Sequence, residues 1–134
     1  MKHLYVTITG FRHYYGLRPL SVGNVILCRK EPDNSYDGEA IRCSLPAIGT
    51  VGYLANSPDT VAGGTMSAGR VYDRVEKRFY VRVLFTTFTK VICRMEDGEP
   101  EDLEREMRGQ TKETEDDLEE AEALPTGVPE DDGD

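Results

Sequence analysis

Tyr36 and Asp37 are two adjacent residues that could carry out recognition chemistry side by side. The aromatic ring can stack on a flat group, and the carboxylate can accept a proton from a hydroxyl. Both lie in the segment 31–41, which is rich in Pro, Asn, Ser and Gly and separates two apolar runs at residues 22–28 and 40–43. This composition predicts a turn between two strands. Because binding residues concentrate on such connections, the pair is the first candidate site.

The same two residues also have a purely structural interpretation. In an Asx-type turn, Asp37 would accept hydrogen bonds from nearby backbone amides, and Tyr36 would lie on the rim of the fold. The local sequence leaves both interpretations open.

Metal binding and catalysis have little support. Asp33, Ser35 and Asp37 are spaced like the start of a calcium loop, but the twelfth position is Ser44, where a bidentate Glu would be needed. The three cysteines and two histidines lack the short ligand spacings of zinc sites. The chain shows neither a nucleophile–histidine set, nor nuclease metal-ligand spacing, nor a Gly-rich phosphate loop followed by lysine. We therefore expect a protein with no metal, no cofactor and no enzymatic activity.

Cys28, Cys43 and Cys93 lie in apolar runs and are odd in number. This pattern favours buried, reduced thiols and hence a cytoplasmic protein. The sequence has neither the roughly 18 consecutive apolar residues that a membrane span requires nor a signal-peptide pattern at its N-terminus. We expect a cytoplasmic monomer.

Alternating apolar and polar residues predict five to seven short strands and hence a small antiparallel barrel. The candidate strands cover residues 3–11, 22–29, 40–45, 50–54, 66–76, 78–88 and 91–95. Ser57 followed by Pro58 predicts the start of a two-turn helix that ends at Gly63 and Gly64. Gly52 would allow another segment of backbone to approach closely.

The strand expected at residues 78–88 separates its side chains into two faces. Phe79, Val81, Val83 and Phe85 would lie on one face, and Arg78, Tyr80, Arg82 and Leu84 on the other. The second set predicts an exposed, basic face of the sheet.

Charge divides the chain into two unlike parts. Residues 1–95 carry 13 Lys and Arg against 7 Asp and Glu, a net charge of +6, whereas residues 96–134 carry 3 against 18, a net charge of −15. A basic domain favours a polyanionic partner. Within 96–109, Leu103 and Met107 are spaced i,i+4 and predict a short helix over residues 100–108 that packs on the barrel and ends at Gly109. Residues 110–134 are expected to form a disordered acidic tail, which could occupy the basic groove as a phosphate mimic.

Three motifs in order resemble the HIRAN domain, a module found fused to SNF2-type helicases and nucleases and also as small stand-alone proteins. They are GFRHYYG at residues 10–16, RKEPDNSYDGEAI at 29–41 and VGYL at 51–54, and the resemblance covers residues 5–95. Their joint occurrence is more specific than any one of them alone. The resemblance implies an OB-like barrel that binds the 3′ end of single-stranded DNA.

The resemblance also assigns roles to particular residues. Asp37 would accept a hydrogen bond from the terminal 3′-hydroxyl, and Tyr36 would close over the last nucleotide. The remaining contacts would be a phosphate held by Arg12, a base stacked on His13 or Tyr14, and a second base stacked on Phe79. Two positions depart from the family pattern: Tyr53 replaces a histidine, and Asn56 replaces a phosphate-binding lysine.

The sequence therefore predicts a module that binds single-stranded DNA at 3′-hydroxyl ends, in DNA repair or replication-fork processing beside a helicase or nuclease. An alternative from another class is a protein-interaction adaptor, with a peptide-binding barrel face and an acidic tail. The expected organisation is a HIRAN-like barrel at 1–95, a short helix within 96–109 and an acidic tail at 110–134.

Overall fold

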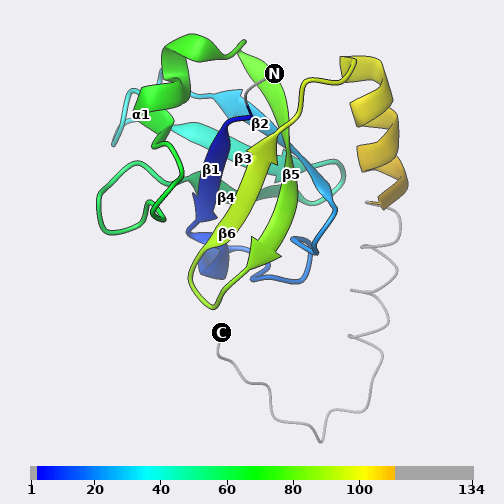
Figure 1. Cartoon of the computed structure of the whole chain (residues 1–134), viewed down its shortest axis with the longest axis horizontal. Helices are drawn as coiled ribbons and strands as arrows, with labels where there is room; N and C mark the ends of the chain where they lie inside the picture. Colours follow the sequence, from blue (N-terminus) through cyan, green and yellow to red (C-terminus); the bar gives the residue numbers. More distant parts are fainter. Residues whose placement is uncertain (1–2, 111–134) are drawn as a thin grey trace, which may run out of the picture.

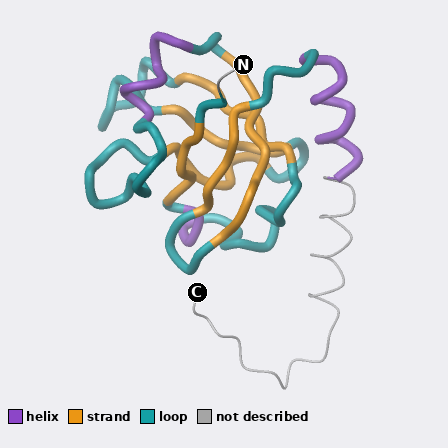
Figure 2. Tube along the Cα trace, viewed as in Figure 1, coloured by secondary structure: helices purple, strands orange, loops and turns teal. Residues whose placement is uncertain are grey.

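A computed structural model describes residues 3–110 of the 134-residue chain. Its main element is a closed barrel of six antiparallel strands (Figure 1), and its loops and helices surround that barrel (Figure 2). The order around the barrel is β1, β4, β3, β2, β5, β6. The strands are β1 (Tyr5–Thr9), β2 (Val25–Lys30), β3 (Ile41–Leu45), β4 (Gly49–Leu54), β5 (Arg78–Thr86) and β6 (Val91–Met95). The expected small antiparallel barrel is confirmed.

The alternating apolar residues of the strands fill the barrel, as period-two patterning requires. On the neighbouring strands β2 and β3, Cys28 and Cys43 face each other in register, with their Sγ atoms 4.0 Å apart. Cys93 on β6 is equally buried, and all three cysteines are free thiols. Burial raises the pKa of the Cys43 and Cys93 thiols well above their ordinary value, which keeps them protonated and unreactive. The prediction of buried thiols is confirmed.

Gly52 on β4 lies where no side chain fits. A Cβ atom there would be 2.8 Å from Cγ2 of Ile8 and 2.9 Å from the carbonyl oxygen of Thr9. Both neighbours belong to β1, whose pairing with β4 fixes the backbone at this point. The predicted close backbone approach at Gly52 is confirmed.

Gly52→Ala should lower the free energy of unfolding by about 1–3 kcal/mol, because the backbone of Thr9 cannot retreat without loosening the β1–β4 pairing. Urea unfolding followed by circular dichroism measures this loss. Gly63→Ala is the matched control, since nothing lies within 4 Å of the added Cβ and the glycine is exposed. If the two variants were equally stable, the close approach at Gly52 would carry no cost.

Between β4 and β5 the predicted elements are wrong. Residues 57–61 make one turn, in which the amides of Thr60 and Val61 both bond the carbonyl of Ser57 at 3.0 Å, and no helix follows. The strand expected at 66–76 is replaced by α1 (Ala68–Val71) and the 3₁₀ turn η2 (Tyr72–Arg74). The Ser67 side chain caps α1 by accepting the amide of Arg70 at 3.2 Å. The buried pair Ala68 and Val71, three residues apart, fits a helix as well as a strand.

A C-terminal helix over residues 100–110 lies against the outside of the barrel (Figure 1). It is anchored by Leu103 and Met107, which are 6% and 1% exposed and belong to the core cluster. The predicted helix is confirmed, but it passes through Gly109 to Gln110 instead of ending at the glycine. Apart from Gln110, the acidic tail and its predicted disorder and groove-occupying role lie outside the described residues.

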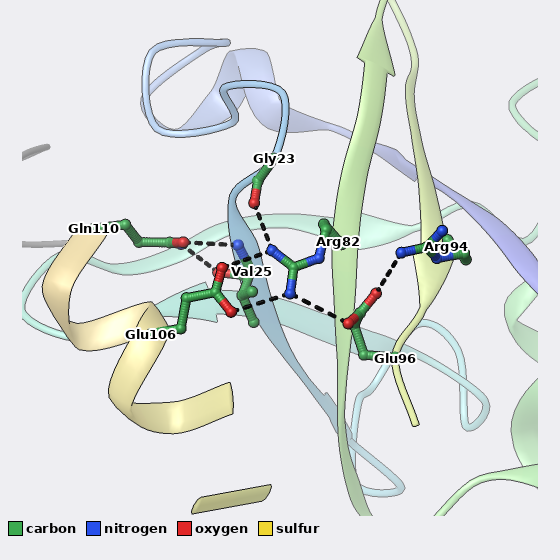
Figure 3. A network of polar contacts seen from close by, with 7 residues as sticks. All are labelled: Gly23, Val25, Arg82, Arg94, Glu96, Glu106 and Gln110. Carbon is green, nitrogen blue, oxygen red and sulfur yellow. Dashed lines mark hydrogen bonds and ion pairs between the residues drawn. The ribbon is translucent and has the colours of Figure 1, made fainter. Parts of the chain in front are cut away.

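This helix overturns the prediction of an exposed basic face at Arg82, whereas Arg78 at the start of β5 is exposed as predicted. Arg82 makes a two-pronged ion pair with Glu106 of the helix, at 2.6 and 3.0 Å, and a further pair with Glu96 at 3.2 Å (Figure 3). Beside it, Tyr80 is 7% exposed and donates its hydroxyl to Glu104 at 2.8 Å. The Gln110 side-chain amide bonds both the amide and the carbonyl of Val25, like one rung of a sheet ladder. Arg82 is therefore neutralised and partly covered, with its side chain 23% exposed.

These contacts predict a pH dependence of stability. The hydrogen bond from Arg82 lowers the pKa of Glu106, and the bond from Tyr80 lowers that of Glu104, both from an ordinary value of 4.5. A carboxyl with a depressed folded-state pKa contributes stability above its unfolded-state pKa and loses that contribution as pH falls through the folded-state value. Both groups are partly exposed, so the contribution is about 1 kcal/mol or less for each.

We therefore expect the double variant Glu104→Gln/Glu106→Gln to be less stable than the natural chain at pH 7, and the gap to close as pH falls below 4.5. Urea unfolding at several pH values measures this. Asp73→Asn, an exposed acid away from the helix, should show no such trend. If the difference in stability between the double variant and the natural chain stayed constant with pH, the two carboxylates would not be the source of the pH dependence.

Candidate functional site

The 31–41 turn is organised by Asn34, which the sequence did not single out. Its Oδ1 accepts the amides of Tyr36 at 2.8 Å and Asp37 at 3.0 Å, and its Nδ2 donates to Glu31 at 3.1 Å. The two ends of the turn are joined by a bond from the amide of Glu31 to the carbonyl of Ala40. An Asx-type turn thus exists here, but Asn34 forms most of it. The sequence could have indicated this role of Asn34, since Asn is a preferred turn residue.

Tyr36 and Asp37 occupy the tip in different ways. Tyr36 is 96% exposed, so its ring is fully available for stacking. Asp37 is half-buried, and its carboxylate accepts the amide of Glu39 at 2.9 Å and the side-chain amide of Asn56 at 2.8 Å. A carboxylate offers about four acceptor positions, and these bonds use two of them. Asp37 is thereby held in place and keeps capacity for a further donor.

A groove of about 530 Å³ runs past this tip. Its walls bring together the 31–41 turn, the end of β4, the 56–60 turn and Tyr14 from the loop after β1. The lining residues are Tyr14, Asn34, Tyr36, Asp37, Ala40, Tyr53, Leu54, Asn56, Ser57 and Thr60. Three phenol rings and one carboxylate therefore share a single groove, with Asp37 as the charged member of the set.

Tyr53 is tied into a network that sequence reasoning missed. Its hydroxyl donates to Glu31 at 2.9 Å, and the guanidinium of Arg42 pairs with the other oxygen of Glu31 at 2.8 Å. Burial and the bond to Glu31 raise the pKa of Tyr53 to about 12. Burial also tends to raise the pKa of Glu31, but the bonds from Asn34 and Tyr53 and the charge of Arg42 outweigh it and lower that pKa. Tyr53 therefore stays protonated and donates its hydroxyl hydrogen bond to Glu31. To donate to a phosphate instead, the Tyr53 hydroxyl would have to break this bond.

Asn56 connects the turn to α1. Its Nδ2 donates to Asp37, and its Oδ1 accepts the amide of Gly69 at 2.8 Å. With both ends of its amide engaged, Asn56 positions Asp37 instead of reaching out as a lysine would. The site therefore has no cation at position 56, and Asn56 instead holds the Asp37 carboxylate in place.

The loop after β1 delivers only part of its predicted contacts to the groove. It begins with the 3₁₀ turn η1 (Phe11–His13), whose Phe11 is 2% exposed and anchors the loop in the core. Tyr14 lines the groove, but Arg12 and His13 are exposed outside its lining. The guanidinium of Arg12 lies 4.1 Å above the ring of Phe88.

Phe79 does not serve the groove. Its side chain is 8% exposed, belongs to the core cluster and does not line the Tyr36–Asp37 groove. The stacking role predicted for Phe79 is therefore wrong. Phe88, which is 70% exposed and lies under Arg12, is the available ring that the sequence analysis overlooked.

Within residues 3–110, no group of three or more His, Cys, Asp or Glu side chains is arranged to hold a metal ion. Within the same range, no helix has the length and apolar character that crossing a membrane demands.

A small closed barrel whose turns build an aromatic groove on its surface has the architecture of a binding domain. The family model of the HIRAN domain matches residues 1–91, which is more than half of the chain. The chain therefore belongs to the HIRAN domain family. In HLTF-like proteins, this domain is known as a nucleic-acid-binding module.

Among solved structures, the chain is similar to the HIRAN domain of human HLTF, with a TM-score of 0.51 and 19% identity over 84% of this chain and 88% of that one. It is also similar to a protein from Lactobacillus plantarum, with a TM-score of 0.48 and 23% identity over 70% of this chain and 93% of that one. At 19% identity, the HLTF structure shares the fold. A search of curated proteins gives no match.

Proposed function

We propose that this protein is a non-enzymatic module that binds the 3′-hydroxyl end of single-stranded DNA. The observation that carries the proposal is the groove that Tyr36, Tyr14 and Asp37 share. An exposed ring can stack on any base, at about 1–3 kcal/mol per base, and therefore gives affinity without sequence preference. A carboxylate held at the same groove can accept a hydrogen bond from a terminal hydroxyl, which only a strand end offers.

The small number of cations at the groove leads us to expect a modest affinity for DNA. The groove lining contains no lysine or arginine, so phosphates would be contacted by side-chain and backbone donors and by exposed cations nearby, of which Arg12 is the candidate in the η1 loop. Its position over Phe88 offers a cation and a second ring together. Membership of the HIRAN family supports the same class of ligand, and we place the protein beside a helicase or nuclease in repair or replication-fork processing.

Tyr36→Ala should weaken the binding of a short single-stranded oligonucleotide about 5- to 100-fold, because it removes a stacking ring. Fluorescence anisotropy with a 5′-labelled strand measures the affinity, and a salt titration separates the contribution of phosphate contacts. The variant should be as stable as the natural chain, since the side chain is 96% exposed.

Val22→Ala is the matched control, an exposed apolar residue away from the groove that should leave binding unchanged. Equal affinities of the natural chain and Tyr36→Ala, or the absence of any oligonucleotide binding at low salt, would contradict the proposed function.

A further inference from the structure

A second groove, of about 630 Å³, lies between β5 and the segment that leads into the C-terminal helix. It shares no lining residue with the Tyr36–Asp37 groove. In the order around the barrel, β5, which lines the second groove, and β4, which lines the first, are three strands apart in either direction. Because the grooves share no lining residue, a partner in one would not occupy the residues that line the other.

The second groove has an apolar floor. Phe79 and Tyr80 contribute from β5, and Leu103 contributes from the first turns of the helix. Gly98 lies beside Leu103, which an added Cβ would meet at ordinary van der Waals distances of 3.7–3.8 Å. The volume falls within the roughly 300–1,000 Å³ typical of ligand pockets.

The rim of this groove is acidic. It carries Glu76, Glu96, Glu101 and Glu104 against the single cation Arg78, a net charge of −3 for the lining. Two of the glutamates are already neutralised within residues 3–110. Glu96 pairs with two arginines, and Glu104 pairs with Arg108 and accepts a bond from Tyr80.

Glu76 and Glu101 differ from those two. Both are exposed, and neither has an ion pair or side-chain hydrogen bond with any residue that the structure describes. They therefore flank the apolar floor as carboxylates that an incoming cation could meet.

We propose that this groove is a docking site for a protein partner, which inserts an apolar side chain flanked by Lys or Arg from a peptide segment. Charge complementarity selects this occupant: the acidic rim repels the phosphates of a nucleic acid and attracts basic residues. An apolar centre inside a charged rim is also the usual layout of a protein interface. The protein would then connect a DNA end in one groove to a protein in the other.

The test uses three fluorescein-labelled nonapeptides and the full chain. In the first, a central Leu is flanked by two lysines on each side; in the second, Ser replaces the Leu; in the third, Glu replaces the lysines. We expect saturable anisotropy binding for the first and at least tenfold weaker binding for the other two. Failure of the first peptide to bind, or equal binding of the Ser-centred peptide, would overturn the proposal.

Two variants locate the site. Gly98→Leu should fill the groove and weaken the first peptide at least tenfold, because the position is exposed, lies outside the left-handed region and has room for a side chain. Glu76→Gln/Glu101→Gln should weaken it about three- to tenfold, as two exposed ion pairs would. The control Asp33→Asn/Asp73→Asn removes two exposed acids that line neither groove and should have no effect.

Peptide binding that survives both groove variants would place the peptide elsewhere and overturn the proposal.

The same samples separate this proposal from the proposed DNA function. Gly98→Leu should leave oligonucleotide affinity unchanged, and Tyr36→Ala should leave peptide affinity unchanged. A loss of oligonucleotide binding in Gly98→Leu would mean that the second groove takes nucleic acid, which would contradict a protein partner.

Discussion

An oligonucleotide that ends in a 3′-phosphate should bind at least tenfold more weakly than one that ends in a 3′-hydroxyl, and Asp37→Asn should largely abolish the difference. The hydroxyl donates a hydrogen bond to the carboxylate, whereas the phosphate brings negative charge beside it. A hydrogen bond to a charged group is worth about 1.5–3 kcal/mol, or roughly 10- to 150-fold in affinity. Anisotropy with the two strands and with a circular strand measures this discrimination.

We expect Asp37 to discriminate between the two strand ends although it already has partners. Its two hydrogen bonds, from the amide of Glu39 and from Asn56, fix the carboxylate without using all of its acceptor positions. Fixing it beforehand avoids an ordering cost when the strand end arrives. In the proposed function, Asn56, at a position where the family pattern has a phosphate-binding lysine, would support selectivity for the end of the strand by holding Asp37, at the loss of a positive charge.

Asp33→Asn is the matched control, because it removes an exposed acid from the same turn that lies outside the groove lining. It should retain the preference for the 3′-hydroxyl. Asp37→Asn should retain most of the stability of the fold, which thermal unfolding checks. If the natural chain bound the 3′-hydroxyl and 3′-phosphate strands equally, Asp37 would have no role in end recognition, even if DNA binding itself remained.

Met107→Ala should lower the free energy of unfolding by about 2–5 kcal/mol, the range found when a large buried side chain is truncated in a packed core. Met107 is 1% exposed and joins the C-terminal helix to the barrel core. This is a large effect for a residue beyond position 91, where the match to the family model ends. It would show that the helix is part of the cooperative fold. Urea unfolding by tryptophan-independent methods, such as circular dichroism, suits this chain, which has no Trp.

Two variants in the same helix serve as controls. Met107→Leu conserves volume and should cost less than about 1.5 kcal/mol. Arg105→Ala, whose side chain is 72% exposed and pairs only with Asp102 among the ion pairs of the described residues, should stay within about 0.5 kcal/mol of the natural chain. If Met107→Ala were as stable as Arg105→Ala, the helix would be docked loosely and its cover over β5 would be dispensable.

The segment after β4 shows where local patterns fail. Ser57 and Pro58 satisfy the rules for a helix start, yet the chain makes one turn there. The actual helix begins after Ser67 and was predicted as a strand, because four residues are too few to distinguish a period of 3.6 from a period of 2. The long strands were predicted well for the opposite reason, since alternation over five or more residues is distinctive.

The sequence alone determined the barrel strands, the buried thiols, the close approach at Gly52, and the Tyr36–Asp37 turn, because each depends on residue types within a short stretch of chain. The tertiary structure decided which distant residues contact those stretches. Alternation predicted that Arg82 shares a face of β5 with Tyr80, but only the folded chain shows that Glu106 covers that face. Likewise, Asn56 holds Asp37 and Glu31 holds Tyr53 across 19 and 22 residues of sequence. Contacts at such separations depend on how the barrel closes, which no local pattern encodes.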